Sequence, residues 1–93
     1  MKKFARRDKM KIYSDLLTIL ESQLDDAEGI VLTRLQMKLN VPYDRLKIYL
    51  AQLKDLGLIE DASLPKLTEK GKQYIREYEN VLDFMNRMGI AYR

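Results

Sequence analysis

Two short amphipathic segments that can form helices joined by only three or four residues constrain the fold of this chain more than any other feature. The second segment spans about residues 42–56, ends before Gly57, and repeats apolar residues at spacings of three and four, namely Leu46, Tyr49, Leu50 and Leu53. This spacing predicts a helix with one buried face. The first segment, Arg34–Leu39, predicts a shorter helix that Thr33 caps. Asn40 is expected to leave that helix in the left-handed conformation. The sequence therefore predicts two helices joined by a tight turn.

A further helix and a short strand are predicted before this pair. Asp8 can cap the helix, which is expected to run to about Asp26 and to end before Gly29. Its apolar residues cover about half of the helix circumference, which is a wider face than packing against a single neighbouring element requires. They are Ile12, Tyr13, Leu16, Leu17, Ile19, Leu20 and Leu24. We therefore expect this helix to pack against more than one neighbour. The β-branched run Ile30-Val31-Leu32 predicts a short edge strand.

A hairpin and a long helix are predicted after the pair. Leu58–Glu60 and Lys66–Thr68 lie on either side of a turn-rich segment and predict two short strands. Thr68 is then expected to cap a fourth helix that extends to about Met88 and stops at Gly89. The predicted fold is mainly α with a small β-hairpin, and its element order is the outline of a winged helix-turn-helix followed by a long C-terminal helix.

Composition excludes most kinds of catalytic site. The 93 residues include no cysteine and no histidine, which removes disulfides, thiolate nucleophiles and the commonest general base and metal ligand. The remaining carboxylates, tyrosines and lysines show no metal-ligand spacing and no glycine-rich phosphate loop. We expect no enzyme, no metal and no cofactor. No apolar stretch approaches the roughly 20 residues that cross a bilayer, and no signal peptide is visible. We therefore expect no membrane partner and a cytoplasmic, nucleoid-associated protein.

Positive charge is concentrated in two places. The net charge is +3, but residues 1–11 carry six cations against one anion. Residues 33–54 carry five cations against the single anion Asp44. Basic surfaces attract polyanions, and an outward helix face fits the major groove of duplex DNA. The pattern indicates double-stranded DNA as the partner.

The candidate DNA-binding residues fall into three groups. Arg45 and Lys47 can reach guanine or phosphate, and Gln52 can read adenine. Under the other interpretation these charges are merely solvated, in weak surface pairs such as Asp44–Lys47 and Lys47–Asp55. Asp44 in the middle of the outward arc also opposes close approach of phosphate. The candidates are, from the N-terminal arm, Lys2, Lys3, Arg6, Arg7 and Lys9; from the first helix of the pair, Arg34 and Lys38; and from the second, Tyr43, Arg45, Lys47, Gln52 and Lys54.

Several motifs give the chain a family resemblance. Four segments carry this resemblance: Asn40–Leu50, Leu56–Glu60, the run Leu67-Thr68-Glu69-Lys70-Gly71, and the basic entry Arg6–Tyr13. They resemble the corresponding segments of archaeal winged-helix DNA-binding proteins. The resemblance covers about residues 5–88 and is greatest to the small dimeric kind with a C-terminal coiled-coil helix. It implies duplex DNA binding by a homodimer, often architectural or weakly specific, with the third helix at the major groove.

The hairpin departs from that family pattern. Wings that read DNA usually carry arginine or lysine at the tip. Here residues 60–65 contain two acids, and no cation comes before Lys66. The sequence therefore disfavours contact between the wing and DNA, and the basic arm is expected to supply backbone contacts instead.

The C-terminal helix carries a heptad-like seam. Its apolar residues recur at intervals of four, three, four and three, and Leu82 widens the seam. We expect this seam to join two copies of the chain, because its far half would otherwise expose apolar side chains. The other interpretation is that the helix folds back along the first helix of its own chain. We assign residues 1–68 to the winged helix-turn-helix domain with its basic arm, and residues 69–93 to the dimerisation helix. The seam residues are Tyr74, Tyr78, Val81, Leu82, Met85 and Met88.

Two functions are consistent with these patterns. The first is a duplex-DNA-binding protein, either a transcriptional regulator or a chromatin-like architectural protein, with the helix at about 42–56 in the major groove. The alternative is a winged-helix protein–protein interaction module without direct DNA contact. The acidic hairpin and the apolar residues Ile48 and Ala51 on the outward arc fit that alternative.

Overall fold

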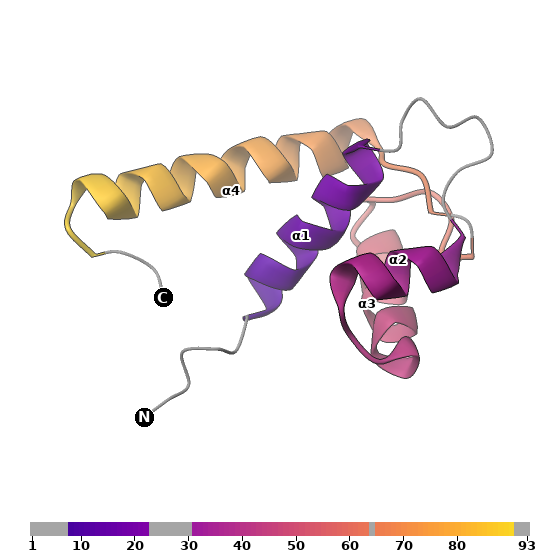
Figure 1. The fold of residues 1–93 in the computed structure, drawn as a ribbon. Helices are drawn as coiled ribbons and strands as arrows, with labels where there is room; N and C mark the ends of the chain where they lie inside the picture. The colour runs from indigo at the N-terminus through magenta and orange to yellow at the C-terminus, as the bar shows by residue number, and fades with distance from the viewer. Residues whose placement is uncertain (1–7, 23–30, 64, 91–93) are drawn as a thin grey trace.

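The computed structural model describes residues 8–22, 31–63 and 65–90, and these residues form four helices (Figure 1). They are α1 (Lys9–Ser22), α2 (Leu32–Leu39), α3 (Tyr43–Asp55) and α4 (Glu69–Arg87). α1 packs against both α2 and α4, and α2 packs against α3. The prediction that the first helix has more than one neighbour is confirmed. The core between these helices is built mainly from fully buried leucines, Leu16, Leu17, Leu35, Leu39, Leu46, Leu50 and Leu53.

The start of α1 follows the prediction, but the start of α2 does not. Asp8 caps α1, because its Oδ1 accepts a hydrogen bond of 2.8 Å from the backbone N–H of Lys11. The predicted extension of this helix to Asp26 lies outside the described residues, as does Ile30. The predicted strand is wrong at its other two positions: Val31 is the extended N-cap of α2, and Leu32 is the first helical residue.

The predicted cap of α2 is also wrong. Thr33 lies inside the helix, and the N-cap residue makes no side-chain capping hydrogen bond. The physical reason is tertiary packing: Leu32 packs against the hydrophobic core in a helical conformation, so the helix begins one residue before Thr33, the predicted N-cap.

The turn between α2 and α3 has the predicted form. Asn40 adopts the left-handed conformation (φ 61°, ψ 53°), and its N–H donates to the carbonyl of Gln36 at 2.8 Å. Pro42 is the N-cap of α3, where its missing N–H has no partner to lose. The four predicted apolar residues of α3 are all buried, and Gly57 ends the helix region at φ 80°. Three residues thus separate the two helices.

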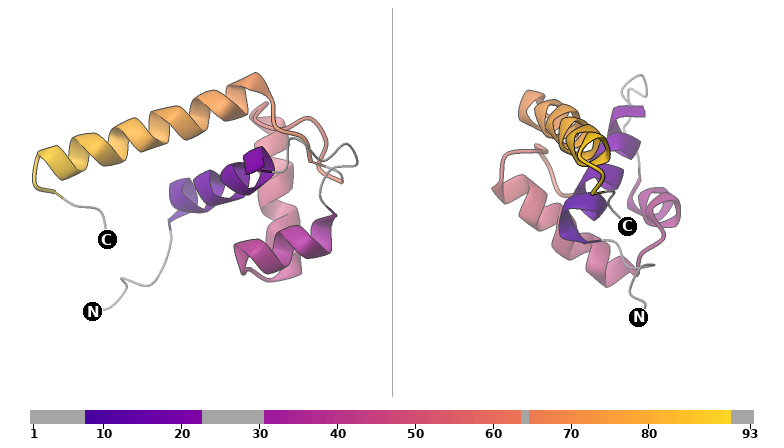
Figure 2. Two further views of the ribbon diagram at one scale, coloured as in Figure 1. Left: turned by 45° about the horizontal axis from the view of Figure 1, so that its top comes forward. Right: turned by 90° about the vertical axis from the view of Figure 1, so that its left-hand side faces the viewer.

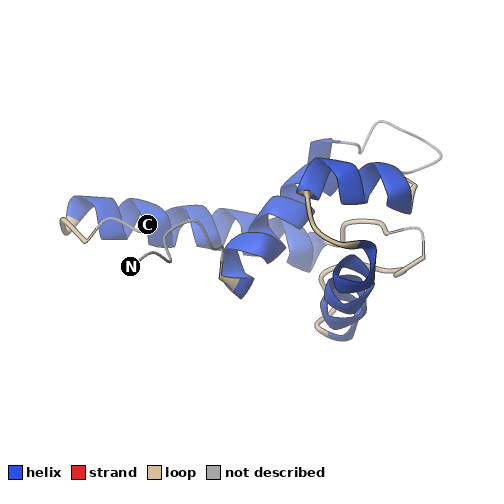
Figure 3. Ribbon diagram, turned by 60° about the horizontal axis from the view of Figure 1, so that its bottom comes forward, coloured by secondary structure: helices blue, strands red, loops and turns tan. Residues whose placement is uncertain are grey.

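The predicted β-hairpin is reduced to one antiparallel bridge, between Ile59 and Leu67. Backbone hydrogen bonds from Glu60 N to Lys66 O (3.0 Å) and from Thr68 N to Leu58 O (3.2 Å) flank it. The described part of the chain contains helices and loops but no strand (Figure 3).

Local chemistry explains why the ladder stops after one pair. The Asp61 carboxylate accepts hydrogen bonds from both the N–H and the hydroxyl of Ser63, so this side chain fixes a turn directly after the bridge. Pro65 has no N–H with which to extend the pairing. The prediction of two strands at residues 58–60 and 66–68 was therefore wrong, although the chain does fold back on itself there.

Residues 67–71 join the bridged segment at residues 58–67, called the wing below, to the end of α3 and the start of α4. The Thr68 hydroxyl accepts from the backbone N–H of Gly71 at 3.0 Å, which confirms the predicted cap of α4, and it donates to the carbonyl of Gly57 at 2.7 Å. The Lys70 ammonium donates to the carbonyl of Leu56 at 2.8 Å, so it neutralises the negative C-terminal end of α3. These bonds fix where α3 ends relative to where α4 begins.

Gly71 is required at this joint because the backbone of the wing lies against it. A Cβ at this position would lie 2.3 Å from the carbonyl oxygen of Leu58. We expect Gly71→Ala to lower the free energy of unfolding by about 1–3 kcal/mol through overpacking. Helix propensity alone would raise that free energy by about 1 kcal/mol. Urea denaturation distinguishes the two signs, and Gln73→Ala on the exposed side of α4 is the control. A more stable Gly71→Ala variant would contradict the close approach.

The first half of α4 packs on α1 of the same chain through tyrosines. The rings of Tyr74 and Tyr78 stack at 6.3 Å, and Tyr74 meets the ring of Tyr13 edge-on at 6.4 Å. The Tyr74 hydroxyl also donates to the carbonyl of Met10 at 2.9 Å. Tyr78 is 6% exposed in the single chain. For this half of α4 the fold-back interpretation describes the structure, because Tyr74 and Tyr78 pack within the chain.

The tyrosine packing makes stability sensitive to alkaline pH. Burial, helped by the neighbouring Tyr78 and Asp8, raises the pKa of Tyr74 to about 12 from its ordinary value of 10.0. The unfolded chain therefore loses this proton at lower pH than the folded chain does, so stability is full below pH 10 and falls as the pH rises toward 12. Urea titrations between pH 8 and 12 should show a smaller alkaline loss in Tyr74→Phe than in wild type. Tyr43→Phe, at an exposed ring, is the control, and equal losses in all three proteins would contradict this expectation.

The far half of α4 extends beyond the other helices. Both Figure 1 and the left view of Figure 2 show α4 continuing past α1, with α3 at the opposite end of the molecule. The longest dimension is 42 Å, against 29 and 23 Å for the other two. The outer surface of α3 and the far end of α4 thus lie far apart and do not compete for the same partner.

Candidate nucleic-acid interface

The candidate interface is the outer surface of α3. Its inner face is fixed by four buried residues, so helical geometry turns the remaining positions outward. Ile48 is 52% exposed and Tyr43 is 40% exposed. The other exposed residues of the surface are Asp44, Arg45, Lys47, Ala51, Lys54 and Asp55. The sequence prediction of the outward arc is therefore confirmed for these positions.

The cations of α3 lie on both sides of this surface. Lys47 and Lys54, seven residues apart, follow one side together with Tyr43, and Arg45 lies on the other side, with Ile48 between them. The Lys47 ammonium sits 5.8 Å from the centroid of the Tyr43 ring, a cation–π contact that holds it toward the N-terminal end of the helix. The surface therefore carries cations on both sides of a centre that holds Ile48 and Ala51 together with the acids Asp44 and Asp55.

These cations are not neutralised by the acids on the same helix. The side-chain ion pairs within residues 8–22, 31–63 and 65–90 are Lys11–Asp15, Lys72–Glu69 and Arg87–Asp83, all on α1 or α4. Neither Asp44–Lys47 nor Lys47–Asp55 forms a pair. The charges of α3 are thus available to an anionic partner, although Asp44 and Asp55 remain on the same surface.

Gln52 is placed differently from the sequence prediction. Its side-chain oxygen accepts a hydrogen bond from the hydroxyl of Tyr13 on α1, and the side chain is only partly exposed. Reading adenine in a bidentate manner needs both the amide oxygen and the amide nitrogen. The hydrogen bond holds the Gln52 side chain toward α1, so Gln52 also links α3 to α1, a role that the sequence did not predict.

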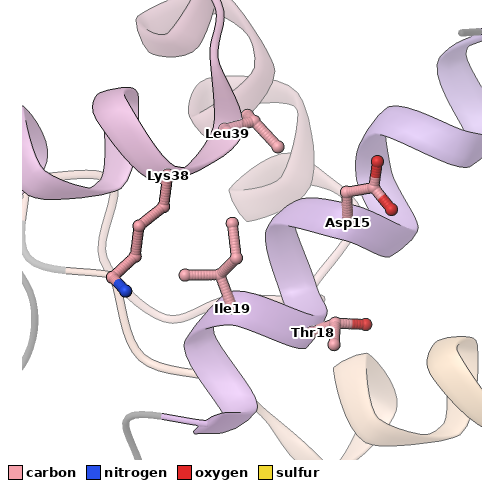
Figure 4. Close-up of a pocket in the computed structure, with 5 residues that line it drawn as sticks. All are labelled: Asp15, Thr18, Ile19, Lys38 and Leu39. Carbon is pink, nitrogen blue, oxygen red and sulfur yellow. The ribbon is translucent and has the colours of Figure 1, made fainter.

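The two candidate cations of α2 are both exposed, but they differ in setting. Lys38 lines an open cavity of about 270 Å³ between α1 and α2, together with Asp15, Thr18, Ile19 and Leu39 (Figure 4). The side chain of Lys38 lies beside Ile19 of α1. Arg34 lies one turn earlier on the exposed side of α2. Among the described residues, no side-chain hydrogen bond or ion pair joins either residue to α3.

The basic arm is only partly described. Lys9 is the first residue of α1 and is exposed. Lys2, Lys3, Arg6 and Arg7 lie outside the described residues. At the wing, Glu60 and Asp61 are exposed, and Lys66 is the next exposed cation. The tip of the wing is therefore acidic, unlike the surface of α3.

Sequence reasoning missed the role of Tyr13. Its apolar spacing assigned it to the core, and it is indeed 7% exposed. It also meets the ring of Tyr49 edge-on at 6.2 Å, in addition to its bond to Gln52. These partners lie 36 and 39 residues away in the sequence, and no local pattern predicts such a pairing.

The comparisons with known proteins identify the family. A family model described as winged helix-turn-helix matches residues 6–86. The chain belongs to the winged helix-turn-helix family. The match extends from the entry of α1 through the wing and almost to the end of α4, and it supports DNA as the partner of this winged helix-turn-helix protein. Neither the curated proteins nor the solved structures include a match to the chain.

The described residues contain neither a membrane span nor a metal-binding cluster. No described helix combines the length and the apolar composition that a membrane span requires. Within the same residues, no group of three or more acidic side chains is arranged to hold a metal ion.

Proposed function

We propose that this winged helix-turn-helix protein binds duplex DNA with α3 in the major groove, as a transcriptional regulator or a chromatin-like architectural protein of the nucleoid. The observation that carries the proposal is the exposed surface of α3, whose cations on both sides form no ion pair with any other described residue. A helix with its side chains is about 10–12 Å across, and the major groove is about 12 Å wide. The cations on the two sides of α3 would then face the phosphates on either side of the groove.

The individual roles follow from position and chemistry. Arg45 has the planar donors that suit guanine or a phosphate, and Lys47 and Lys54 suit phosphate. Ile48 and Ala51, at the centre, suit the methyl group of thymine. Asp44 and Asp55 oppose phosphate, so the proposal favours weak sequence specificity. The arm, with Lys2, Lys3, Arg6, Arg7 and Lys9, would contribute backbone contacts.

The first test reverses the charge at Arg45. We expect Arg45→Glu to weaken duplex binding about 10- to 100-fold, the range for losing one good contact of this kind. It should also reduce the slope of log affinity against log salt by about one contact, each of which contributes roughly −0.9 to that slope. Fluorescence anisotropy with a labelled duplex across a salt series measures both quantities.

The matched control is Arg76→Glu, which makes the same charge change at an exposed position of α4. It should bind duplex DNA within about twofold of wild type at moderate salt, because Arg76 is not on the surface of α3 and salt screens charges that do not contact the duplex. Equal losses in the two variants would show a general effect of net charge and would contradict a contact at α3.

The far half of α4 supports a second copy of the chain as a partner. Val81, Phe84 and Met88 recur at spacings of three and four and are 43%, 50% and 59% exposed. Contiguous apolar side chains of this kind are unusual on a monomer surface. We infer a homodimer through this half of α4, with Leu82 and Met85 at its margin, as in the archaeal proteins that the sequence resembles. Such a dimer would present two α3 helices to one duplex.

The dimer is tested by placing charge on this stripe. We expect Val81→Asp/Met88→Asp to be monomeric in sedimentation experiments at concentrations where wild type is dimeric, because an interface cannot bury unpaired carboxylates cheaply. Asn80→Asp/Asn86→Asp adds the same two charges at exposed polar positions of the same segment and should remain dimeric. A monomeric wild-type protein, or equal dissociation of the two variants, would contradict the proposal.

A protein-docking function is the second candidate. The half-exposed Ile48 at the centre of the α3 surface and the acidic tip of the wing favour it. Under this function the wild-type protein would show no salt-dependent retention of duplex DNA. The anisotropy series on wild type therefore separates the two candidates before any variant is made.

A further inference from the structure

Tyr13 connects three helices and contacts the inner side of α3. From α1 it packs edge-on against Tyr49 of α3 at 6.2 Å and against Tyr74 of α4 at 6.4 Å. Its hydroxyl donates to the side-chain oxygen of Gln52, which is also on α3. One largely buried side chain thus meets both the helix proposed to read DNA and the helix proposed to dimerise.

The two partners of Tyr13 on α3 are three residues apart. Tyr49 and Gln52 therefore lie on one side of the helix, almost one turn apart along its axis. A ring contact and a directional hydrogen bond at these two points restrict rotation of α3 about its axis, because hydrogen bonds weaken steeply when they are misaligned. The buried leucines determine which face of α3 points inward, and the two contacts of Tyr13 restrict the small rotations that remain.

Rotation of α3 matters because of where its cations lie. Arg45 and Lys47 stand on opposite margins of the outer surface, so a rotation that brings one closer to the duplex moves the other away. The same hydrogen bond holds the partly exposed Gln52 amide toward α1 and so keeps it from turning outward to a bidentate contact with a base. The contact with Tyr13 therefore affects both the alignment of α3 and the set of groups that it offers.

We propose that Tyr13 is a positioning residue for DNA recognition: through Tyr49 and Gln52 it sets the rotation of α3, and it withholds Gln52 from the bases. This inference rests on the proposed binding of duplex DNA by α3. Because Tyr13 also packs edge-on against Tyr74, it connects the orientation of α3 with that of α4. Tyr13 itself makes no contact with DNA.

The direct test is Tyr13→Phe, which keeps the ring and removes only the hydroxyl. We expect duplex affinity per folded molecule to fall about 3- to 10-fold, the factor that one ordinary hydrogen bond is worth. The freed Gln52 amide should also increase the preference for duplexes that contain adenine in the major-groove site. Anisotropy titrations with A/T-rich and G/C-rich duplexes of equal length measure both changes, and stoichiometric titration gives the active fraction.

Tyr74→Phe is the matched control. It removes a tyrosine hydroxyl from the same aromatic cluster, but that hydroxyl donates to Met10 of α1 and not to α3. It should bind both duplexes within about twofold of wild type. If Tyr13→Phe and Tyr74→Phe lose affinity equally, the cluster serves stability alone and the inference is overturned.

A second variant keeps the test valid if Tyr13→Phe folds poorly. Gln52→Met removes the acceptor while nearly conserving the volume, so it should reproduce the loss of affinity without the gain in adenine preference. The double variant should bind no more weakly than either single variant, because both remove the same bond. Additive losses would overturn the inference. Failure of the wild-type protein to bind duplex DNA would overturn the proposed function itself, whereas equal affinity of wild type and Tyr13→Phe would overturn only the role of Tyr13.

Discussion

The packing of α1 between α4 and the α2–α3 pair is the constraint on which the rest of the structure depends. Leu16 and Leu17 are fully buried, and burial of such a side chain contributes about 1.5–3 kcal/mol. Because α1 is covered on both sides, α2 and α3 bury only their inner faces, and the outer face of α3 stays exposed. The chain thereby combines a compact core with an exposed helical surface, which is what contact with a groove requires.

The joint around Thr68 gives the wing a structural role. Its bonds to Gly57 and Gly71, with the bond from Lys70 to the end of α3, connect the wing, α3 and α4 within a few residues. The tip of this wing is acidic, whereas the candidate DNA-binding cations Arg34, Lys38, Arg45, Lys47 and Lys54 are exposed on α2 and α3. The molecule therefore separates the part that holds α3 in place from the part that is proposed to meet DNA.

Local signals in the sequence predicted the elements that local chemistry determines. Asn40, Gly57 and the cap at Thr68 each depend on residues within a few positions, and all three predictions were confirmed. The strand at Val31–Leu32 and the full hairpin were wrong, because packing of Leu32 and the Asp61 turn outweigh β propensity. The positions of Gln52 and Tyr74 depend on partners 39 and 64 residues away, which no spacing rule reaches. The exposed cations of α3 could be predicted, but the way α3 is held could not.

The claim that α3 meets the major groove is tested most directly by mapping contacts on the protein. Backbone amide spectra of the isotope-labelled full chain, recorded during titration with a short duplex, report which residues change environment. The proposed function predicts that the largest changes fall on exposed residues of α3, among them Arg45, Ile48 and Ala51, and that the far half of α4 changes little. Changes confined to the wing or to α4, with α3 unaffected at saturating duplex, would contradict it.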